Sequence, residues 1–491
     1  MRLFHPFKPY PKQTVGLYQG HLVGFIIWSI FVVFVTDSTA APGDISTIAG
    51  NGTGGYSGDG GIATNAMLSD PMGVALDADD NLYIADLTNH CIRRVDAVTG
   101  EITTVAGTGM QGFNGDGIAA TLAQLSYPFA IALDGTGNLY IADSTNHRVR
   151  RVDKVTGLIS TVAGTGSAGS SGDGGAATVA QMREPIDLAF DSFGNLFIAE
   201  LRNHQIRKVD GSNGNISTVA GSGTLGYNGD GIAATTADLY YPSGIVLGSD
   251  GDLFIGDTGN DRIRRVDAVT GLIETVAGNG VRGFSGDGGL ATAAQIAYST
   301  GIGLDGVGNL FIADQDNHRV RRVDATTGAI ATVAGAGTNG YSGDGGPAVS
   351  AQLYFPYDVA FDSKGHLYIA DPNNDRIRRV ESAGELPEPV LRVAKPKPFP
   401  ATRKSSSSRP QAVVVKNEGS GPLEGLAVSV AGRHRRDFRV KPLLQTRLAP
   451  GATSHFSLTF KPRDTGIRKA DVTVQSENAG AITWPIKGKG K

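Results

Sequence analysis

Short runs of apolar residues alternate with turn residues along most of this chain. Between residues 71 and 107 the runs PMGVALD, NLYIAD, HCIRRVD and EITTVAG are each rich in Val, Ile, Leu or Tyr. Asp, Asn, Gly and Thr separate these runs, as expected for short β-strands joined by tight turns. The stretch therefore predicts a four-stranded antiparallel sheet.

The same pattern returns six times at a fixed interval of 57 residues, without insertion or deletion. A Gly-Asp-Gly triplet marks every copy, with its aspartate at Asp59, Asp116, Asp173, Asp230, Asp287 and Asp344. Tandem strand-rich units of this length are typical of propeller blades. The sequence predicts an all-β fold that contains a six-bladed β-propeller.

The two ends of the repeated region complement each other. The region begins with ISTIAG (Ile45 to Gly50), which matches the fourth strand of a unit, and ends with RIRRVE (Arg376 to Glu381), which matches the third. We expect the N-terminal strand to pair into the sixth blade and close the ring, because this removes two exposed sheet edges.

A different pattern follows the repeats. A stretch dense in Pro, Lys and Ser leads into the alternating runs AVVVKN, LAVSVAG, HFSLTF, ADVTVQS and ITWPIKG. Such alternation over about 100 residues predicts a β-sandwich. The predicted domains are a propeller over residues 42–384 and, over residues 385–491, a linker with an Ig-like β-sandwich.

Residues 1–41 have the pattern of an export segment. The basic residues Arg2, Lys8 and Lys12 precede the apolar run LVGFIIWSIFVVFV, and small residues follow around Ala40. A cleaved signal peptide fits this order, whereas the uncharged interval from Gln13 to Thr36 is long enough for an uncleaved membrane anchor. Both alternatives stay open, and both predict a secreted, periplasmic or cell-surface protein that contacts a membrane only through such an anchor.

Charge and cysteine content narrow the function classes. Residues 42–380 carry 21 Lys and Arg against 37 Asp and Glu, whereas residues 381–491 carry 20 against 9. No arginine-rich groove with interleaved aromatics is evident, so we expect no nucleic-acid partner. The one cysteine, Cys91, excludes an internal disulfide. Its counterparts in the other repeats are Arg or Gln, so we expect a solvent-facing, non-catalytic thiol.

The repeated run NLYIADLTNHCIRRVD resembles the NHL repeat, a propeller motif, and the inserted GYSGDGG segment resembles the NHL propellers of teneurin-type proteins. Two repeats carry Asp261 and Asp375 in place of the motif's His, and none carries its Leu. The C-terminal region is similar to Ig-like domains of the ASH and choice-of-anchor D type through Asn417, Phe460 and neighbouring turn residues. This second resemblance implies a binding role by analogy.

The Gly-Asp-Gly segments and the Asn-His pairs each have a structural and a ligand-binding interpretation. Asp59 could bind calcium, but calcium needs six or more oxygens, and the following AxxAxL spacing favours a helical turn that the carboxylate caps. Asn89 and His90 return in nearly every blade, which favours turn hydrogen bonding and packing between blades over a central metal site. We therefore expect no cofactor and no metal, with calcium as the alternative.

Departures from the repeat are the better indicators of function. The third residue of the innermost strand is Gly or Ala in four repeats but an acid at Asp187 and Asp358, half a turn apart around the ring. Aromatic residues precede that strand in several repeats, and Arg183 with Glu184 replaces them in the third. The candidate ligand-binding residues are Asp187, Asp358, Glu184, Arg183, Tyr127, Tyr241, Tyr298 and Tyr354. Packing between blades, with the acids bound to local backbone, is the structural alternative.

Taken together, these patterns predict an exported, non-enzymatic interaction or adhesion scaffold. We expect a monomer that binds a protein or glycan partner through the loop-rich face of the propeller. The alternative is a propeller enzyme of the metal-dependent lyase or lactonase type with a site at the channel mouth, which would need several ligands from different blades and a general base.

Overall fold

The computed structural model describes residues 43–382, 391–393, 398–417, 423, 425–441, 443, 447–448, 453–476 and 480–491. The predicted export segment, residues 1–41, lies outside them. Among the described residues, no helix is long and apolar enough to cross a membrane.

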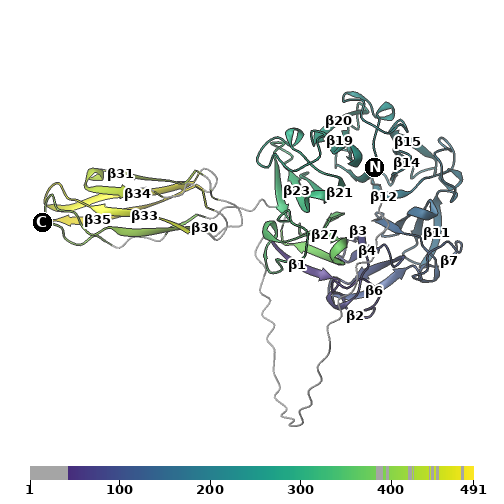
Figure 1. Cartoon of the computed structure of the whole chain (residues 1–491), viewed down its shortest axis with the longest axis horizontal. Coiled ribbons are helices and arrows are strands. Elements are labelled where there is room, and N and C mark those ends of the chain that lie inside the picture. Colours follow the sequence, from purple (N-terminus) through teal and green to yellow (C-terminus); the bar gives the residue numbers. More distant parts are fainter. Residues whose placement is uncertain are drawn as a thin grey trace, which may run out of the picture. The chain divides into compact units, whose positions relative to one another are not determined.

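Residues 44–380 form six antiparallel sheets, each a propeller blade whose first strand is innermost (Figure 1). The first blade contains β3 (Pro71–Leu76), β4 (Leu82–Asp86), β5 (Cys91–Val95) and β6 (Glu101–Ala106). The second and third contain β8 (Pro128–Leu133), β9 (Leu139–Asp143), β10 (Arg148–Val152), β11 (Leu158–Ala163), β12 (Pro185–Phe190), β13 (Leu196–Glu200), β14 (Gln205–Val209) and β15 (Ile216–Ala220). The innermost strands contact each other in a closed ring.

The remaining blades repeat this order. The fourth and fifth contain β17 (Pro242–Leu247), β18 (Leu253–Asp257), β19 (Arg262–Val266), β20 (Leu272–Ala277), β21 (Ser299–Leu304), β22 (Leu310–Asp314), β23 (Arg319–Val323) and β24 (Ile330–Ala334). The sixth contains β26 (Val359–Phe361), β27 (Leu367–Asp371) and β28 (Arg376–Val380). Its fourth strand is β1 (Asp44–Ala49), which pairs antiparallel with β28 so that Ile45 faces Val380. The predicted closure by the N-terminal strand is confirmed, and Figure 1 shows purple β1 beside the green strands.

Each Gly-Asp-Gly segment crosses the outer edge of its own blade. In four blades it adds a short fifth strand beside the fourth, which the sequence did not predict: β2 (Gly61–Ile62), β7 (Ile118–Ala119), β16 (Ile232–Ala233) and β25 (Gly346–Pro347). A one-turn 3-10 helix follows in all six: η1 (Ala63–Asn65), η2 (Ala120–Leu122), η4 (Ala177–Val179), η5 (Ala234–Thr236), η7 (Ala291–Ala293) and η9 (Ala348–Ser350). Covering an outer strand limits the exposed sheet edge.

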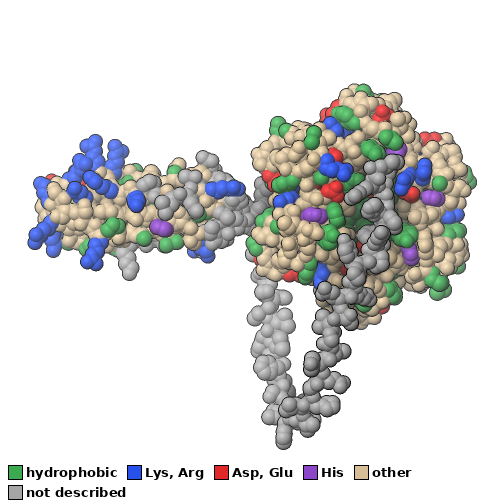
Figure 2. All heavy atoms as spheres, in the orientation of Figure 1, with side chains coloured by type: hydrophobic (Ala, Val, Ile, Leu, Met, Phe, Trp, Pro, Cys, Tyr) green, Lys and Arg blue, Asp and Glu red, His purple; other side chains and the backbone are tan. Residues whose placement is uncertain are grey.

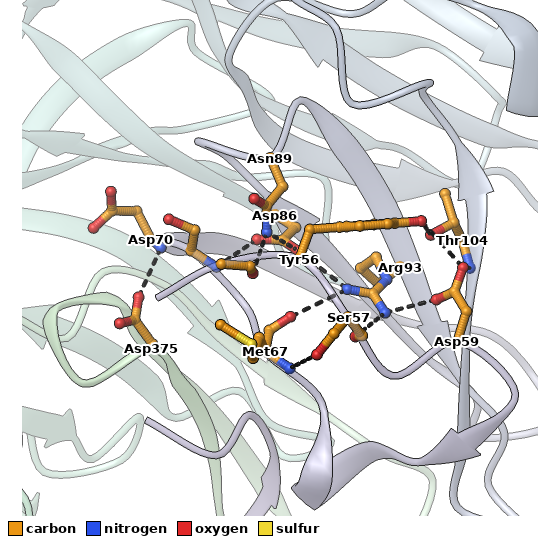
Figure 3. A network of polar contacts seen from close by, with 12 residues as sticks. Tyr56, Ser57, Asp59, Met67, Asp70, Asp86, Asn89, Arg93, Thr104 and Asp375 are labelled. Carbon is orange, nitrogen blue, oxygen red and sulfur yellow. Dashed lines mark hydrogen bonds and ion pairs between the residues drawn. The ribbon is translucent and has the colours of Figure 1, made fainter. Parts of the chain in front are cut away.

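The Gly-Asp-Gly aspartate does not cap this helical turn, so that prediction was wrong. The N-cap of η1 is Ile62, with no side-chain cap. Asp59 instead accepts a hydrogen bond from Arg93 Nη2 at 2.6 Å and from Thr104 N at 3.2 Å (Figure 3). Arg93 is fully buried and also lies 3.4 Å from the buried Asp86. Since a buried guanidinium needs charged partners, the aspartate neutralises a cation inside the blade.

Every blade contains this arrangement of one buried arginine between two carboxylates. The equivalent arginines are Arg150, Arg207, Arg264, Arg321 and Arg378, all with no exposed surface. Their partners are Asp116 with Asp143, Asp173 with Glu200, Asp230 with Asp257, Asp287 with Asp314, and Asp344 with Asp371. The next arginine along the strand pairs with the acid two residues later in four blades, as Arg94 does with Asp96 at 3.2 Å.

The Asn-His pairs join loops and blades, as expected. Asn89 donates from Nδ2 to the Gly55 carbonyl at 2.7 Å, so the turn between the second and third strands lies against the Gly-Asp-Gly segment of the same blade. His90 accepts the Tyr127 N–H of the next blade at Nδ1, 3.2 Å away, and meets the Tyr127 ring edge-on. Four of these turns include 3-10 helices: η3 (Ser144–Asn146), η6 (Thr258–Asn260), η8 (Gln315–Asn317) and η10 (Pro372–Asn374).

Cys91 is fully buried, which contradicts the predicted exposure. In other blades the arginine at this position extends over an aromatic ring, as Arg148 does over Phe113 at 3.9 Å. A long side chain reaches the surface from a buried backbone position, whereas the short thiol stays inside. Burial raises the pKa of Cys91, which makes the thiol less reactive.

The C-terminal residues form two antiparallel sheets around one apolar core. One sheet has the order β29-β30-β33-β32 and the other β31-β34-β35. The elements are β29 (Leu391–Val393), β30 (Gln411–Asn417), β31 (Ala427–Ala431), η11 (Arg435–Asp437), β32 (Phe438–Lys441), β33 (Thr453–Phe460), β34 (Gly466–Ser476) and β35 (Gly480–Gly490). Phe456 and Trp484 contribute to the core from opposite sheets. Two packed sheets agree with the predicted sandwich, whereas its Ig-like relationship stays a prediction.

Candidate functional site

Asp187 and Asp358 face the central channel and tie neighbouring blades together. Asp187 accepts the Leu188 N–H of its own strand at 2.8 Å and the Ile245 N–H of the next blade at 2.6 Å. Asp358 makes the same two bonds, to Val359 N at 2.8 Å and to Val74 N at 3.0 Å. Each carboxylate therefore joins two innermost strands, which is a structural role.

The two acids also interact electrostatically. Burial raises the pKa of Asp187 well above its usual range, and the negative charge of Asp358 raises it further. Burial likewise raises the pKa of Asp358, while the backbone N–H groups of Val74 and Val359 lower it. Because two like charges in a poorly solvated site disfavour each other, the pair retains a proton more readily than surface aspartates do.

The channel between these acids is almost filled. It leaves a cavity of about 10 Å³, close to the least that one water molecule needs. The residues around it are Gly73, Phe129, Ala130, Ile186, Asp187, Ser243, Gly244, Gly301, Tyr357 and Asp358. The rings of Phe129 and Tyr357 lie 6.0 Å apart. A sugar or peptide therefore has no room in this cavity beside the acids.

The other predicted residues lie around the channel at the start of the innermost strands. Tyr127, Glu184, Tyr241 and Tyr298 occupy equivalent positions with φ between 50° and 52°. Arg183 and Tyr354 lie one residue earlier in their repeats and donate their backbone N–H to Glu200 and Asp371. The left-handed backbone recurs in every blade, so it belongs to the repeat architecture. We call these six residues the rim.

On one side of the ring, the rim carries charged and aromatic groups in contact. Arg202 donates from Nε to Glu184 at 3.0 Å, and its guanidinium lies 5.9 Å from the centre of the Tyr241 ring. In the next blades, Arg282 lies 5.2 Å from the centre of the Tyr298 ring and pairs with Asp261 at 3.3 Å. Arginine over an aromatic face is a favourable contact.

The Arg202 and Arg282 groups are neighbours, because Tyr241 and Tyr298 directly precede the adjacent innermost strands β17 and β21. Burial raises the pKa of the Tyr298 phenol, and the negative charge of Asp316 raises it further, while the Arg282 charge lowers it. Arg183 is exposed next to Glu184, and Arg282 also lies 3.6 Å from Asp316. We call the rim residues Arg183, Glu184, Tyr241 and Tyr298, together with Arg202, Tyr240, Arg282 and Asp316 beside them, the charged sector.

Sequence reasoning missed Arg202, Arg282 and Asp316, although their positions also depart from the repeat. The counterparts of Arg202 are Thr88, Thr145, Gly259, Asp316 and Asn373, and those of Arg282 are Gly54, Gln111, Ala168, Leu225 and Asn339. A comparison of the repeats across the Gly-Asp-Gly segments and across the turns between the second and third strands would have found them. The Tyr127 and Tyr354 positions lie on other blades, outside this sector.

The sector offers recognition chemistry. Guanidinium forks bind carboxylates and other planar acceptors in two-pronged fashion, and tyrosine rings offer flat apolar faces with a polar hydroxyl. Among the described residues, no three His, Cys, Asp or Glu side chains come together as a metal would require.

The propeller sequence is similar to known NHL-repeat proteins. A model of the NHL repeat matches residues 68–95 and 239–265. The chain is 30% identical over 325 residues to protein SUPPRESSOR OF QUENCHING 1, chloroplastic, of Arabidopsis thaliana. This alignment covers 64% of this chain and 30% of that protein. It is 27% identical over 380 residues to teneurin-1 of Homo sapiens, in an alignment that covers 69% of this chain and 13% of that protein. The chain thus spans less than a third of either relative.

A solved structural genomics protein of unknown function from Bacteroides thetaiotaomicron has the same fold. Its TM-score is 0.52 at 18% sequence identity, and the alignment covers 68% of this chain and 75% of that one. At this identity the likeness shows the fold alone. Together with the six repeated sheets, the comparisons show that this chain carries an NHL-repeat β-propeller related to the NHL regions of teneurins and of SUPPRESSOR OF QUENCHING 1.

Proposed function

We propose that this chain is an exported, non-enzymatic binding protein whose propeller recognises a protein or glycan partner through the charged sector. The supporting observation is the set of arginine and carboxylate side chains that most repeats lack, in contact with rim tyrosines of neighbouring blades. A side chain that most blades lack is not explained by the fold. The charged sector also lies on the face of the propeller that carries the Gly-Asp-Gly segments, and binding residues concentrate on such loops.

The enzyme alternative finds less support in the geometry. A lyase- or lactonase-type mechanism needs accessible groups that act on substrate. Asp187 and Asp358 instead accept two backbone hydrogen bonds each, and the cavity beside them has room for about one water molecule. Glu184 is engaged by Arg202.

A binding screen with matched variants tests the proposal. The wild-type chain is applied to a glycan array and to candidate extracellular protein domains, and each hit is measured again with Arg202→Gln/Arg282→Gln. This variant should lose at least tenfold in affinity, because each arginine lost from a binding centre costs on the order of 1 to 2 kcal/mol.

The matched control is Lys154→Gln/Lys364→Gln, which removes two exposed charges from turns on the opposite face. It should bind like the wild type. Equal binding by both variants would place the partner elsewhere on the chain, and turnover of a lactone or of another screened substrate would favour the enzyme alternative.

A further inference from the structure

The outer face of the sheet β31-β34-β35 carries a group of basic side chains at one end. In the pairing of β34 with β35, Lys469 stands opposite Lys487, and Ile467 stands opposite Lys489. The alternate residues, such as Ala470, face the apolar core. Residues paired directly across two strands share a face, so the three lysines and the isoleucine lie together on the solvent side.

The neighbouring loop extends this group. His434 donates its N–H to the Lys469 carbonyl at 3.2 Å, which places the loop beside the lysines. Arg433, Arg435 and Arg436 on this loop are exposed, as are Lys469 and both β35 lysines. We call Arg433, Arg435, Arg436, Ile467, Lys469, Lys487 and Lys489 the basic end. Figure 2 shows Lys and Arg side chains gathered at one end of the C-terminal sheets.

The basic end carries more positive than negative side chains in the part of the chain that the structure describes. Among the described residues, its lysines and arginines form no ion pair. The nearby Asp464 pairs instead with Arg468 at 3.5 Å and with Lys404 at 3.6 Å. Asp471 borders the group on the same face, opposite Pro485. Two lysines directly opposite each other destabilise a sheet, so folding alone does not explain their arrangement.

An exposed apolar side chain lies in the middle of these charges. Ile467 is 63% exposed beside Lys469 and opposite Lys489. Basic clusters are attracted to anionic lipid surfaces, and apolar side chains between them enter the boundary between headgroups and acyl chains. Proteins that bind single-stranded nucleic acid stack bases on aromatic rings, and none of the seven residues is aromatic.

We propose that the basic end is a binding surface for the anionic headgroups of a phospholipid bilayer. This goes beyond the proposed function, because it uses a different part of the chain and a different kind of partner. The surface attracts the bilayer by charge and adds one apolar contact through Ile467. Binding therefore depends on anionic lipid and weakens as salt screens the charges.

Vesicle co-sedimentation of the full-length chain tests this proposal. Vesicles of phosphatidylcholine alone are compared with vesicles that also contain phosphatidylserine, so that any contribution of the N-terminal apolar segment is common to both. The wild type should prefer the anionic vesicles. Lys487→Gln/Lys489→Gln should lower that binding on the order of twentyfold, since each basic residue contributes about 1 kcal/mol, or about fivefold.

Two further variants separate lipid binding from general charge attraction. Arg439→Gln/Lys441→Gln removes two exposed charges from β32 of the other sheet and should bind like the wild type. Ile467→Ser keeps every charge and should weaken binding to anionic vesicles without changing binding to heparin. Near-ultraviolet circular dichroism checks that each variant is folded.

Three results would overturn the proposal. The first is equal binding of the wild type to neutral and anionic vesicles. The second is an equal loss in the β32 control, which would show that only net charge matters. The third is heparin or single-stranded DNA binding that exceeds vesicle binding and is indifferent to Ile467→Ser, which would identify an anionic polymer as the partner.

Discussion

At the scale of single residues, the most consequential feature is the buried arginine of each blade. Arg150 has no exposed surface and lies between Asp143, equally buried, and Asp116, whose side chain is 43% exposed. Burial raises the pKa of Asp143 to about 6, although the Arg150 charge lowers it. The two carboxylates thus differ in solvation while sharing one cation.

This difference predicts unequal effects of neutralising the two acids. Asp143→Asn leaves Arg150 without its buried partner and should cost about 3 to 5 kcal/mol. Asp116→Asn removes a partly solvated partner and should cost about 1 kcal/mol. Asp153→Asn, which breaks the pair with Arg151, should cost the least of the three and serves as the control. Denaturant unfolding measures the order, and equal losses for Asp143 and Asp116 would refute it.

At the scale of elements, β1 completes a sheet whose other strands lie more than 280 residues later in the sequence. Ile45 is 1% exposed and belongs to the core shared by the fifth and sixth blades. Thr47 donates its backbone N–H to Asp344 at 3.1 Å, so the Gly-Asp-Gly segment of the last repeat holds the strand from outside. The ring therefore closes through side chains as well as backbone pairing.

Deleting residues 45–50 should lower the melting temperature by ~10 °C or more, because the loss of a core strand costs several kcal/mol and exposes two strand edges. Aggregation should rise as well. Ile62→Ser, on the half-exposed fifth strand β2, should leave the melting temperature nearly unchanged. A closed and equally stable ring after the deletion would show that β1 is dispensable.

The sequence predicts the elements well because each repeat carries its own alternation of apolar and turn residues, and six copies confirm one another. It predicts single-residue roles less well. The pairing of Asp59 with Arg93 joins residues 34 positions apart, and no local pattern distinguishes it from a helix cap. Asp187 lies on the innermost strand β12 as predicted, and Asp358 lies one residue before β26, but only the packed channel shows that their oxygens face backbone N–H groups.

At the scale of the whole molecule, the blades are joined by a repeated bond that depends on pH. His90, His147, His204 and His318 each accept a backbone N–H of the next blade at Nδ1, and Asp261 and Asp375 do so through a carboxylate at the other two interfaces. A histidine can accept at Nδ1 only when that nitrogen is unprotonated. Protonation therefore removes an acceptor at four of the six joints.

The sign of this pH dependence follows from the pKa shifts. Burial lowers the pKa of all four histidines below 6.5, so below that pH the unfolded chain binds more protons than the folded one. Their contribution to stability is complete above pH 6.5 and is lost as the pH falls through the folded-state pKa. Buried acids such as Asp257, with a pKa raised to about 6, act in the opposite direction.

Replacing all four histidines by Asn isolates their share. Asn accepts the same N–H through its side-chain oxygen, does not titrate, and tolerates the left-handed backbone that these positions adopt. The wild type should lose more stability between pH 7.5 and pH 5 than the variant, as measured by melting temperature, because the other titrating groups are common to both. The two proteins should melt within a few degrees of each other at pH 7.5. Parallel pH profiles would show that the histidines remain unprotonated, or unbonded, throughout this range.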